Sequence, residues 1–185
     1  MKMYLNHNQI EALIANEFVT NTDSSCVNAA SLDLRLGESI LVETWSDSMC
    51  PLDYSKRDKL CMNTVKISTN GYKVRPGEFF LAHTMEICNF PDDLAALFRI
   101  KSSMGRIGLE HMDAGWIDPG FHGSLTLEFK NMTNYHDIVI RPGDRIGQLI
   151  FLRGVPVTGA QSYRTKGNYN GAISVKQVGY EPTKT

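Results

Sequence analysis

The pattern of apolar positions changes near residue 20, and the first part of the chain has the period of a helix. The apolar residues Ile10, Leu13, Ile14 and Phe18 follow the i, i+3, i+4, i+8 pattern of a helix. This spacing places them on one face of a helix, and Asn8 with Glu11 has the pattern of a capping box at its start. We therefore expect a short N-terminal helix over about residues 8–18, with a packing role rather than a functional one.

The rest of the chain has the two-residue period of strands, interrupted by turn residues. Polar and apolar residues alternate from Ser31 to Leu36, which predicts a half-buried strand that ends in a turn at Gly37. Residues 46–63 are polar and lack a period, so they predict a long excursion, and residues 90–99 are compatible with a second short helix or a turn. Short strand candidates follow the excursion, with turn signals between them.

Two segments, residues 74–78 and residues 140–144, place Pro-Gly between apolar runs. Proline presets φ at the first central turn position and glycine supplies the positive φ of the second, so each segment favours a type II turn. A strand, a Pro-Gly turn and a strand used twice indicate a barrel or a jelly-roll-like sandwich. We expect one mainly β domain over residues 1–185, with a C-terminal arm from about residue 160.

Composition and charge narrow the class of protein. The 185 residues carry a net charge of −1 with a pI near 6.5, without the basic excess of proteins that coat duplex DNA or a membrane surface. The four cysteines form no Cys-x-x-Cys pair and have no histidines at zinc-ligand spacing, so reduced thiols explain them best. No apolar stretch has the length of a signal-peptide core or a membrane span. We expect a soluble cytoplasmic metabolic protein that binds neither nucleic acid nor membranes.

Cationic and hydroxyl side chains gather in residues 101–106. They are Lys101, Ser102, Ser103 and Arg106. Lysine offers a point charge and arginine a planar fork, and both suit phosphate oxygens. A helical turn over residues 103–106 would add free backbone N–H groups that face an anion. Taken alone, however, the composition favours a solvated surface loop.

Residues 114–123 place three glycines and a proline around Asp118. Glycines let the backbone approach a flat ligand closely, and its exposed N–H and C=O groups can read a base edge. Asp118 is suited to accept a hydrogen bond from a sugar hydroxyl, and Phe121 to pack against the sugar ring. The alternative is a tight turn in which Asp118 caps its own backbone.

The following segment carries Glu128. Polar residues alternate with apolar ones over residues 124–129, so Glu128 lies on the polar face of a strand. That face either points into water or lines a pocket. A partly desolvated carboxylate in a pocket is suited to proton transfer. Periodicity alone leaves both alternatives open.

In this order, the motifs resemble the dCTP deaminase branch of the dUTPase superfamily. The similarity extends over five segments, residues 30–37, 101–106, 114–123, 127–129 and 141–151. It implies a distorted, dUTPase-like β-barrel or jelly roll that assembles as a homotrimer with active sites shared between subunits. It also implies deamination without zinc, and the H-x-E and P-C-x-x-C strings of the zinc deaminases do not occur in the sequence. Mg²⁺ would enter with the triphosphate.

The resemblance also assigns catalytic roles. Glu128 matches the glutamate that activates water for attack on cytosine C4 and then delivers protons to N3 and the leaving ammonia. Ser102 and Arg106 match residues that position the water and the reacting edge. Asp118 matches the contact to the deoxyribose 3′-hydroxyl. In members that also hydrolyse dUTP, the same aspartate helps to hold the water that attacks the phosphate.

Further residues match substrate contacts. They are Lys101, Ser103 and Gln148 for the phosphates, the backbone of Ala114, Trp116 and Ile117 for the base, and Phe121 for the sugar. The C-terminal arm departs from the family pattern of a tyrosine, a short spacer and Lys-Tyr-x-x-Gln-x-Gly, because residues 163–171 are shorter and lack the glutamine. Tyr163 and Lys166 are the candidates to serve there. The departure fits an altered substrate choice, such as a modified cytosine nucleotide.

The motifs also bear on the branch of the family. Lys101 and the run over residues 114–121 resemble the bifunctional enzymes, which take dCTP to dUMP, more than the monofunctional deaminases. Glu128 favours deamination over a plain dUTPase, an enzyme of a different reaction class. A non-catalytic nucleotide-binding regulator is disfavoured because Ser102, Arg106 and Asp118 are also present. Feedback inhibition by dTTP is a further expectation from the resemblance.

Overall fold

The computed structural model describes residues 4–45, 51–56 and 58–178, and strands predominate within them. The helices are α1 His7–Ala15, α2 Ser102–Arg106 and α3 Tyr163–Lys166, with 3₁₀ turns at Ser24–Cys26 and Tyr54–Lys56. The strands are β1 Val19–Thr20, β2 Leu32–Glu43, β3 Met62–Lys66, β4 Tyr72–Val74, β5 Phe79–Thr84, β6 Ile87–Asn89, β7 Leu94–Ile100, β8 Leu109–His111, β9 Trp116–Ile117, β10 His122–Gly123, β11 Thr126–Asn131, β12 Ile138–Ile140 and β13 Arg145–Arg153. No helix in these ranges is both long enough and apolar enough to cross a membrane.

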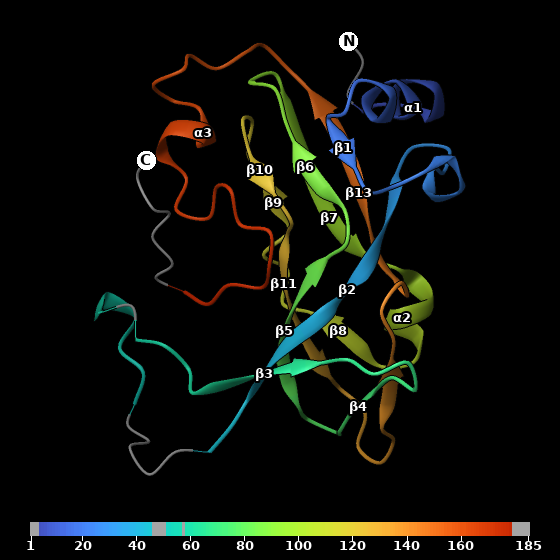
Figure 1. The fold of residues 1–185 in the computed structure, drawn as a ribbon, viewed down its shortest axis with the longest axis vertical. Coiled ribbons are helices and arrows are strands. Elements are labelled where there is room, and N and C mark those ends of the chain that lie inside the picture. Colours follow the sequence, from blue (N-terminus) through green and yellow to red (C-terminus); the bar gives the residue numbers. More distant parts are fainter. Residues whose placement is uncertain (1–3, 46–50, 57, 179–185) are drawn as a thin grey trace.

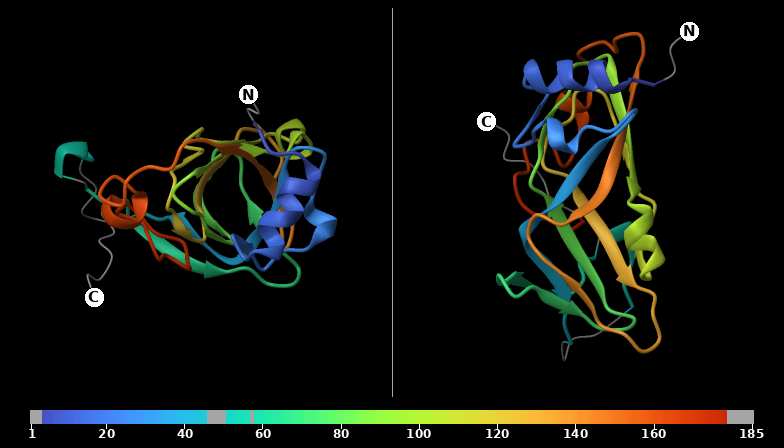
Figure 2. Two further views of the ribbon diagram at one scale, coloured as in Figure 1. Left: turned by 90° about the horizontal axis from the view of Figure 1, so that it is seen from above. Right: turned by 90° about the vertical axis from the view of Figure 1, so that its right-hand side faces the viewer.

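The strands form antiparallel sheets that curl around one interior (Figure 1). The largest sheet of the described chain has the order β8-β11-β5-β2-β13-β7-β9, with β3 beside β2. A second sheet has the order β1-β6-β10, and β4 pairs with β12. The left view of Figure 2 looks along the resulting ring of strands, and its right view shows α1 at one end of the barrel. The mainly β barrel with a short N-terminal helix is therefore confirmed.

Phenylalanine side chains fill much of the interior. Those exposed by 1% or less are Phe80, Phe90, Phe98, Phe129 and Phe151. Phe80 stacks on Phe129 at a centroid distance of 5.5 Å, and Phe90 meets Phe151 edge-on at 5.9 Å. Burial of one such side chain contributes roughly 1.5–3 kcal/mol. This aromatic core holds the strands of the barrel in place.

The start of α1 lies earlier than the apolar pattern indicates. The side chain of Asn6 accepts the N–H of Gln9, and the Gln9 side chain accepts the N–H of Asn6, both at 3.2 Å. The prediction of a capping box at Asn8 and Glu11 is wrong, because both residues lie inside the helix. Both pairs fit the capping pattern, and the extended backbone of Asn6 (φ −89°, ψ 176°) decides between them.

The end of α1 also differs from the prediction. The helix ends at Ala15, and Glu17 adopts a left-handed conformation with φ 57°. The N–H of Phe18 bonds to the carbonyl of Leu13 at 2.9 Å, which is a Schellman-type helix end. Phe18 therefore packs on the core from the segment after the helix, although its spacing matches the helical face.

β2 continues through Gly37, so the predicted turn there is wrong. The strand pairs with β13 before Gly37 and with β3 beyond it, and it pairs with β5 on both sides of Gly37. Glycine is needed because a Cβ at this position would collide with the His83 ring. The prediction of a half-buried strand is also wrong, since the consecutive residues Leu32, Asp33 and Leu34 are all buried. Alternation does not show that both faces of β2 are covered.

Both Pro-Gly turns form as predicted. Gly77 and Gly143 have φ values of 76° and 86°. In each turn the residue after glycine donates its N–H to the carbonyl of the arginine before proline, at 3.0 Å and 3.1 Å. These values are typical of type II turns. The strands ahead of the two turns, β4 and β12, pair with each other.

Residues 90–99 form a turn and then a strand. The N–H of Leu94 bonds to the carbonyl of Pro91 at 3.2 Å, and β7 begins at Leu94. β7 pairs with β13 along its whole length, and this pairing outweighs the helical propensity of its leucine and alanine residues. Of the two alternatives for this segment, the turn is confirmed and the helix is wrong. The predicted excursion ends where β3 begins, and its residues 46–50 and 57 lie outside the described residues.

Candidate active site

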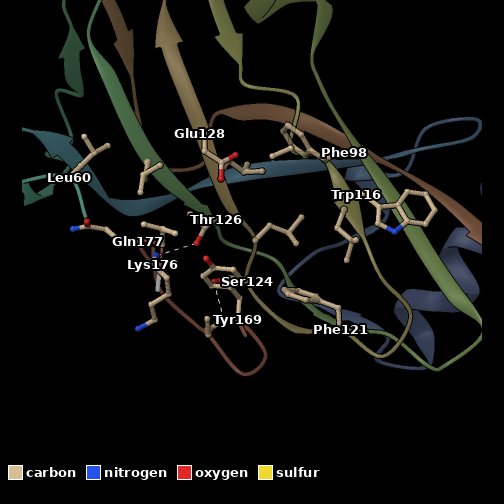
Figure 3. A pocket seen from close by; sticks show the side chains of 18 of the residues that line it. Leu60, Phe98, Trp116, Phe121, Ser124, Thr126, Glu128, Tyr169, Lys176 and Gln177 are labelled. Carbon is tan, nitrogen blue, oxygen red and sulfur yellow. Dashed lines mark hydrogen bonds between the residues drawn. The ribbon is translucent and has the colours of Figure 1, made fainter. Parts of the chain in front are cut away.

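A pocket with a volume of about 720 Å³ lies beside β9 and β11, under the C-terminal arm (Figure 3). Segments far apart in the sequence contribute to its lining, from residues 52–62, 114–118, 124–128 and 163–178. Asp118 and Glu128, the two carboxylates singled out from the sequence, are both among the lining residues. The barrel therefore brings these two acids to one cavity.

Glu128 faces the pocket, which decides between the two alternatives left by periodicity. Glu128 and Thr126 line the pocket, whereas the next residue, Phe129, is buried and does not line it. The Glu128 side chain is 30% exposed, and its Oε2 atom is buried without a hydrogen-bond partner among the described residues. Such an oxygen is suited to take a proton from a water molecule held in the pocket.

His111 on β8 lies beside Glu128. The pairing of His111 with Phe129 across β8 and β11 brings the imidazole Nε2 to 3.5 Å from Glu128 Oε2. The ring is 6% exposed and packs against Phe98 and Phe129, at centroid distances of 4.7 Å and 5.5 Å. Its Nδ1 accepts the N–H of Asp113 at 3.2 Å, so the proton of the neutral ring is on Nε2, toward Glu128. His111 Nε2 and Glu128 Oε2 lie close without forming a hydrogen bond, so His111 is a candidate to orient the carboxylate when substrate binds.

Asp118 lies just after β9, and Trp116 directs its carboxylate. The indole Nε1–H donates a hydrogen bond to Asp118 Oδ1 at 2.9 Å. The alternative from the sequence was a carboxylate that caps its own turn, but this turn is closed by the backbone, with the N–H of Phe121 donating to the Asp118 carbonyl at 3.3 Å. The carboxylate is left on the pocket wall, where a ligand hydroxyl can reach it.

Residues 114–117 also line the pocket. Gly115 holds this backbone close to β7, because its carbonyl accepts the N–H of Phe98 at 2.7 Å. A Cβ at Gly115 would lie 2.6 Å from the Phe98 carbonyl oxygen, so a side chain does not fit. Ala114 and Ile117 therefore both lie on the pocket, and the contact of this segment with a base stays a prediction.

Two aromatic rings form the wall next to this backbone. Phe121 and Tyr163 lie at a centroid distance of 5.6 Å. Phe121 is buried and Tyr163 is half-buried, and burial raises the pKa of the Tyr163 hydroxyl. The Tyr163 oxygen accepts the N–H of Tyr169 at 3.4 Å. Both residues predicted for this region therefore lie on the pocket.

The C-terminal arm docks against β10. The N–H of Gly171 bonds to the carbonyl of His122 at 2.7 Å, and the N–H of Ser124 bonds to the carbonyl of Ala172 at 2.8 Å. Gly123 has φ 135°, and a Cβ there would collide with the Ala172 backbone. The close approach thus depends on glycine, and it holds the arm over one side of the pocket.

Docking brings several arm residues to the pocket that the sequence motifs did not single out, and three of them have polar side chains. They are Tyr169, Lys176 and Gln177. The backbone N–H of Lys176 bonds to Thr126 Oγ1 at 3.2 Å, and Gln177 Oε1 is buried with no hydrogen-bond partner in the part of the chain that the structure describes. Lys166 is exposed on α3 and is not among the lining residues. The altered arm motif hides these residues from sequence comparison, and only the docking reveals them.

A second group of predicted residues lies apart from the pocket. It consists of Lys101, Ser102, Ser103, Arg106 and Gln148, none of which lines the pocket in the described structure. Lys101 Nζ binds the buried Asp33 at 2.7 Å, and Gln148 pairs with Asp33 across β13 and β2. The serines and the arginine are exposed on α2, which begins one residue earlier than expected. One chain therefore carries two separate groups of predicted site residues, which we call half-sites.

The sequence was compared with models of known protein families. The family model described as dCTP deaminase-like matches residues 4–154, which include the barrel and both half-sites except the arm. The chain belongs to the dCTP deaminase-like family. This membership agrees with the resemblance drawn from the short motifs.

Curated relatives are similar to this chain in sequence, and a solved structure is similar to it in fold. The "dCTP deaminase, dUMP-forming" of Rhodococcus opacus (strain B4) is 41% identical over 133 residues, or 71% of this chain and 69% of the relative. The protein of the same name from Persephonella marina is 36% identical over 154 residues, or 82% of this chain and 84% of the relative. The 2′-deoxycytidine 5′-triphosphate deaminase of Agrobacterium tumefaciens matches 82% of this chain with a TM-score of 0.66 and 28% identity. This chain spans about half of that structure, 48% of its length.

One further residue of this dCTP deaminase-like site escaped the sequence motifs. His111 stands alone between Glu110 and Met112, in a run without a known pattern. Its proximity to Glu128 depends on the register of β8 against β11, which sequence periodicity does not reveal. Conversely, the described residues contain no group of three or more His, Cys, Asp or Glu side chains placed to hold a metal ion.

Proposed function

We propose that this protein deaminates dCTP to dUTP by hydrolysis without zinc, and that it then hydrolyses dUTP to dUMP and diphosphate. The observation that carries the proposal is Glu128, a pocket carboxylate with a buried oxygen that lacks a hydrogen-bond partner among the described residues. Family membership supports the deamination step, and the relatives named "dCTP deaminase, dUMP-forming" support both steps.

In the proposed mechanism, Glu128 moves the protons of the reaction. It takes a proton from water as the water oxygen bonds to C4 of cytosine, and this proton passes to N3. The tetrahedral C4 then carries a hydroxyl and an amino group. Glu128 transfers the hydroxyl proton to the amino group, the C4–N bond breaks, and ammonia leaves as the C4 carbonyl forms. Glu128 ends in its starting state, and His111 keeps its carboxylate oriented throughout.

The pocket suggests how the nucleoside is held. We assign Asp118 to the deoxyribose 3′-hydroxyl, Phe121 to the sugar ring and the backbone of residues 114–117 to the base. In the second step Asp118 would help to hold the water that attacks the phosphate. Lys176 lies on the pocket whereas Lys166 does not, so we assign the arm's phosphate contact to Lys176.

The two half-sites support a shared active site. We propose a homotrimer in which α2 of one subunit, with Lys101 and Gln148, completes the pocket of its neighbour. Ser102 and Arg106 would then position the attacking water and the reacting edge, while Lys101, Ser103 and Gln148 would bind phosphates. Closed cyclic assemblies are common among homo-oligomers.

Mixing two inactive variants tests the shared site. We expect Arg106→Ala and Glu128→Gln to be nearly inactive alone, but co-expression should restore ammonia release from dCTP. In random mixed trimers about one quarter of the sites combine a wild-type α2 with a wild-type Glu128, so recovery should approach about one quarter of wild-type activity. Two differently tagged copies of Glu128→Gln serve as the control. Mixed oligomers isolated through both tags but without activity would contradict a shared site.

The remaining parts of the proposal concern ions, location and control. Mg²⁺ is usually bound through substrate phosphates with few protein ligands, so we propose that it enters with the triphosphate. Scattered free thiols, including the exposed Cys61, fit a cytoplasmic protein. dTTP shares the sugar, the triphosphate and a pyrimidine ring with the substrate, and we propose it as a feedback inhibitor at this pocket.

Product analysis tests the activity itself. Incubation with dCTP should release ammonia and diphosphate in equal amounts, and dUTP alone should release diphosphate. Ammonia without diphosphate would restrict the activity to deamination. Diphosphate from dUTP with no ammonia from dCTP would indicate a plain dUTPase. Binding without either product would indicate a nucleotide-binding regulator.

A further inference from the structure

We infer that Trp116 is a positioning residue that holds the Asp118 carboxylate, so that the pocket selects nucleotides with a free 3′-hydroxyl. The inference rests on the proposed function, because it assumes a deoxynucleoside triphosphate in this pocket. It extends that function by naming the group that makes the sugar contact selective. The hydrogen bond from Trp116 Nε1 to Asp118 Oδ1, at 2.9 Å, is its starting point.

The local backbone places the two side chains on the same side of the chain. Residues two apart on a strand share a face, and the intervening Ile117 is buried in the barrel. Trp116 pairs with Leu97 across β9 and β7, so its backbone is part of the sheet. The indole has a single N–H donor, and this donor is used on Asp118 although the Trp116 side chain is 56% exposed.

The turn after β9 holds Asp118 from the other side. Pro119 and Gly120 occupy its centre, Gly120 has φ 82°, and the Asp118 carbonyl accepts the N–H of Phe121 at 3.3 Å. These features form a third Pro-Gly turn of type II. A Cβ on Gly120 would collide with Ser162 of the arm, so the turn is also packed from outside. The backbone of Asp118 is thereby fixed, and its side-chain torsions remain for Trp116 to restrain.

The restrained carboxylate suits one particular donor. A carboxylate has about four lone-pair positions, and the indole occupies one of them on Oδ1. A sugar hydroxyl can donate to the others without displacing the indole. Figure 3 shows Trp116 across the pocket from Lys176, with Glu128 and Phe121 between them. Because Asp118 bonds to Trp116, we place the sugar on the Trp116 side of the pocket and the base near Glu128.

Trp116 could also act in a different way, as a flat platform on which the cytosine ring stacks. Stacking would favour every cytosine nucleotide equally, whatever its 3′ position. Positioning of Asp118 would favour only those nucleotides that carry a 3′-hydroxyl. The two roles therefore separate when dCTP is compared with 2′,3′-dideoxy-CTP.

The test is Trp116→Phe, which keeps an aromatic ring but removes the N–H. We expect KM for dCTP to rise by about three- to tenfold, with kcat changed less. Without the indole N–H, the Asp118 side chain is ordered only when the nucleotide binds, and this ordering weakens binding. KM for 2′,3′-dideoxy-CTP should stay the same, so the preference for dCTP falls by that factor. Asp118→Asn should remove the same preference, and the double variant should show no further loss. Trp45→Phe, a change at an exposed tryptophan outside the pocket, is the matched control.

Two results would overturn the inference. One is an equal loss for both nucleotides, which would assign Trp116 to stacking. The other is an unchanged preference in Trp116→Phe. Calorimetric titration of Glu128→Gln, with and without Trp116→Phe, measures the same preference as binding of dCTP and 2′,3′-dideoxy-CTP. If the wild-type protein releases no ammonia but this binding preference still depends on Trp116, the proposed function fails and the positioning role stands.

Discussion

Glu128→Gln is expected to lower ammonia release from dCTP by about a hundred- to ten-thousandfold while dCTP binding changes little. Glutamine keeps the shape of the side chain and its place on the pocket wall, but it neither accepts a proton from water nor returns one. General acid–base catalysis by one group typically contributes a factor of this size. The measurement is the rate of ammonia release at saturating dCTP, together with the dCTP dissociation constant from calorimetry.

Glu110→Gln is the matched control for this change. Glu110 lies on β8, pairs with Lys130 of β11 in the same sheet, and is exposed outside the pocket. Ammonia release by the Glu110→Gln variant should stay within about twofold of wild type, because surface substitutions usually have small effects. Ammonia release by Glu128→Gln at the wild-type rate would remove Glu128 from the mechanism. A loss of dCTP binding in that variant would instead assign Glu128 to substrate binding.

Arg35→Met should destabilise the fold by about 3–5 kcal/mol, the usual result when one partner of a buried ion pair is removed. Glu86 is fully buried, and its two oxygens accept hydrogen bonds from Arg35 Nε at 2.7 Å and from the Arg35 backbone N–H at 2.8 Å. Burial raises the pKa of Glu86, and the hydrogen bonds from Arg35 oppose this effect. Methionine replaces the apolar stem of the arginine but leaves the carboxyl group without its cation.

The measurement is the free energy of unfolding in urea at a fixed protomer concentration, since assembly adds to apparent stability. Lys66→Met is the control, because Lys66 and Glu38 form an ion pair at 3.8 Å in which both side chains are largely exposed. Its effect should stay below about 1 kcal/mol. Equal, small effects for both variants would show that the Arg35–Glu86 pair contributes no more than a surface pair.

Local chemistry predicts the turns of this fold well and the strands less well. The Pro-Gly turns depend on the φ preferences of two adjacent residues, and both form as expected. The segment that becomes β7 has leucines and alanines that favour a helix, and only its pairing with β13 makes it a strand. Gly37 looks like a turn residue, but its role is to leave room for His83. Such roles depend on neighbours that are distant in the sequence.

The site shows the same division. The sequence by itself determined the family, the mainly β fold and the identity of the two acids, Asp118 and Glu128, because these depend on residue types at short spacings. The tertiary structure alone decided that Glu128 faces a pocket, that His111 lies beside it and that the arm brings Lys176 to the same wall. It also separated α2 from that pocket within one chain. Strand register and docking of the arm set these relations, and both arise from long-range packing that a single sequence pattern does not encode.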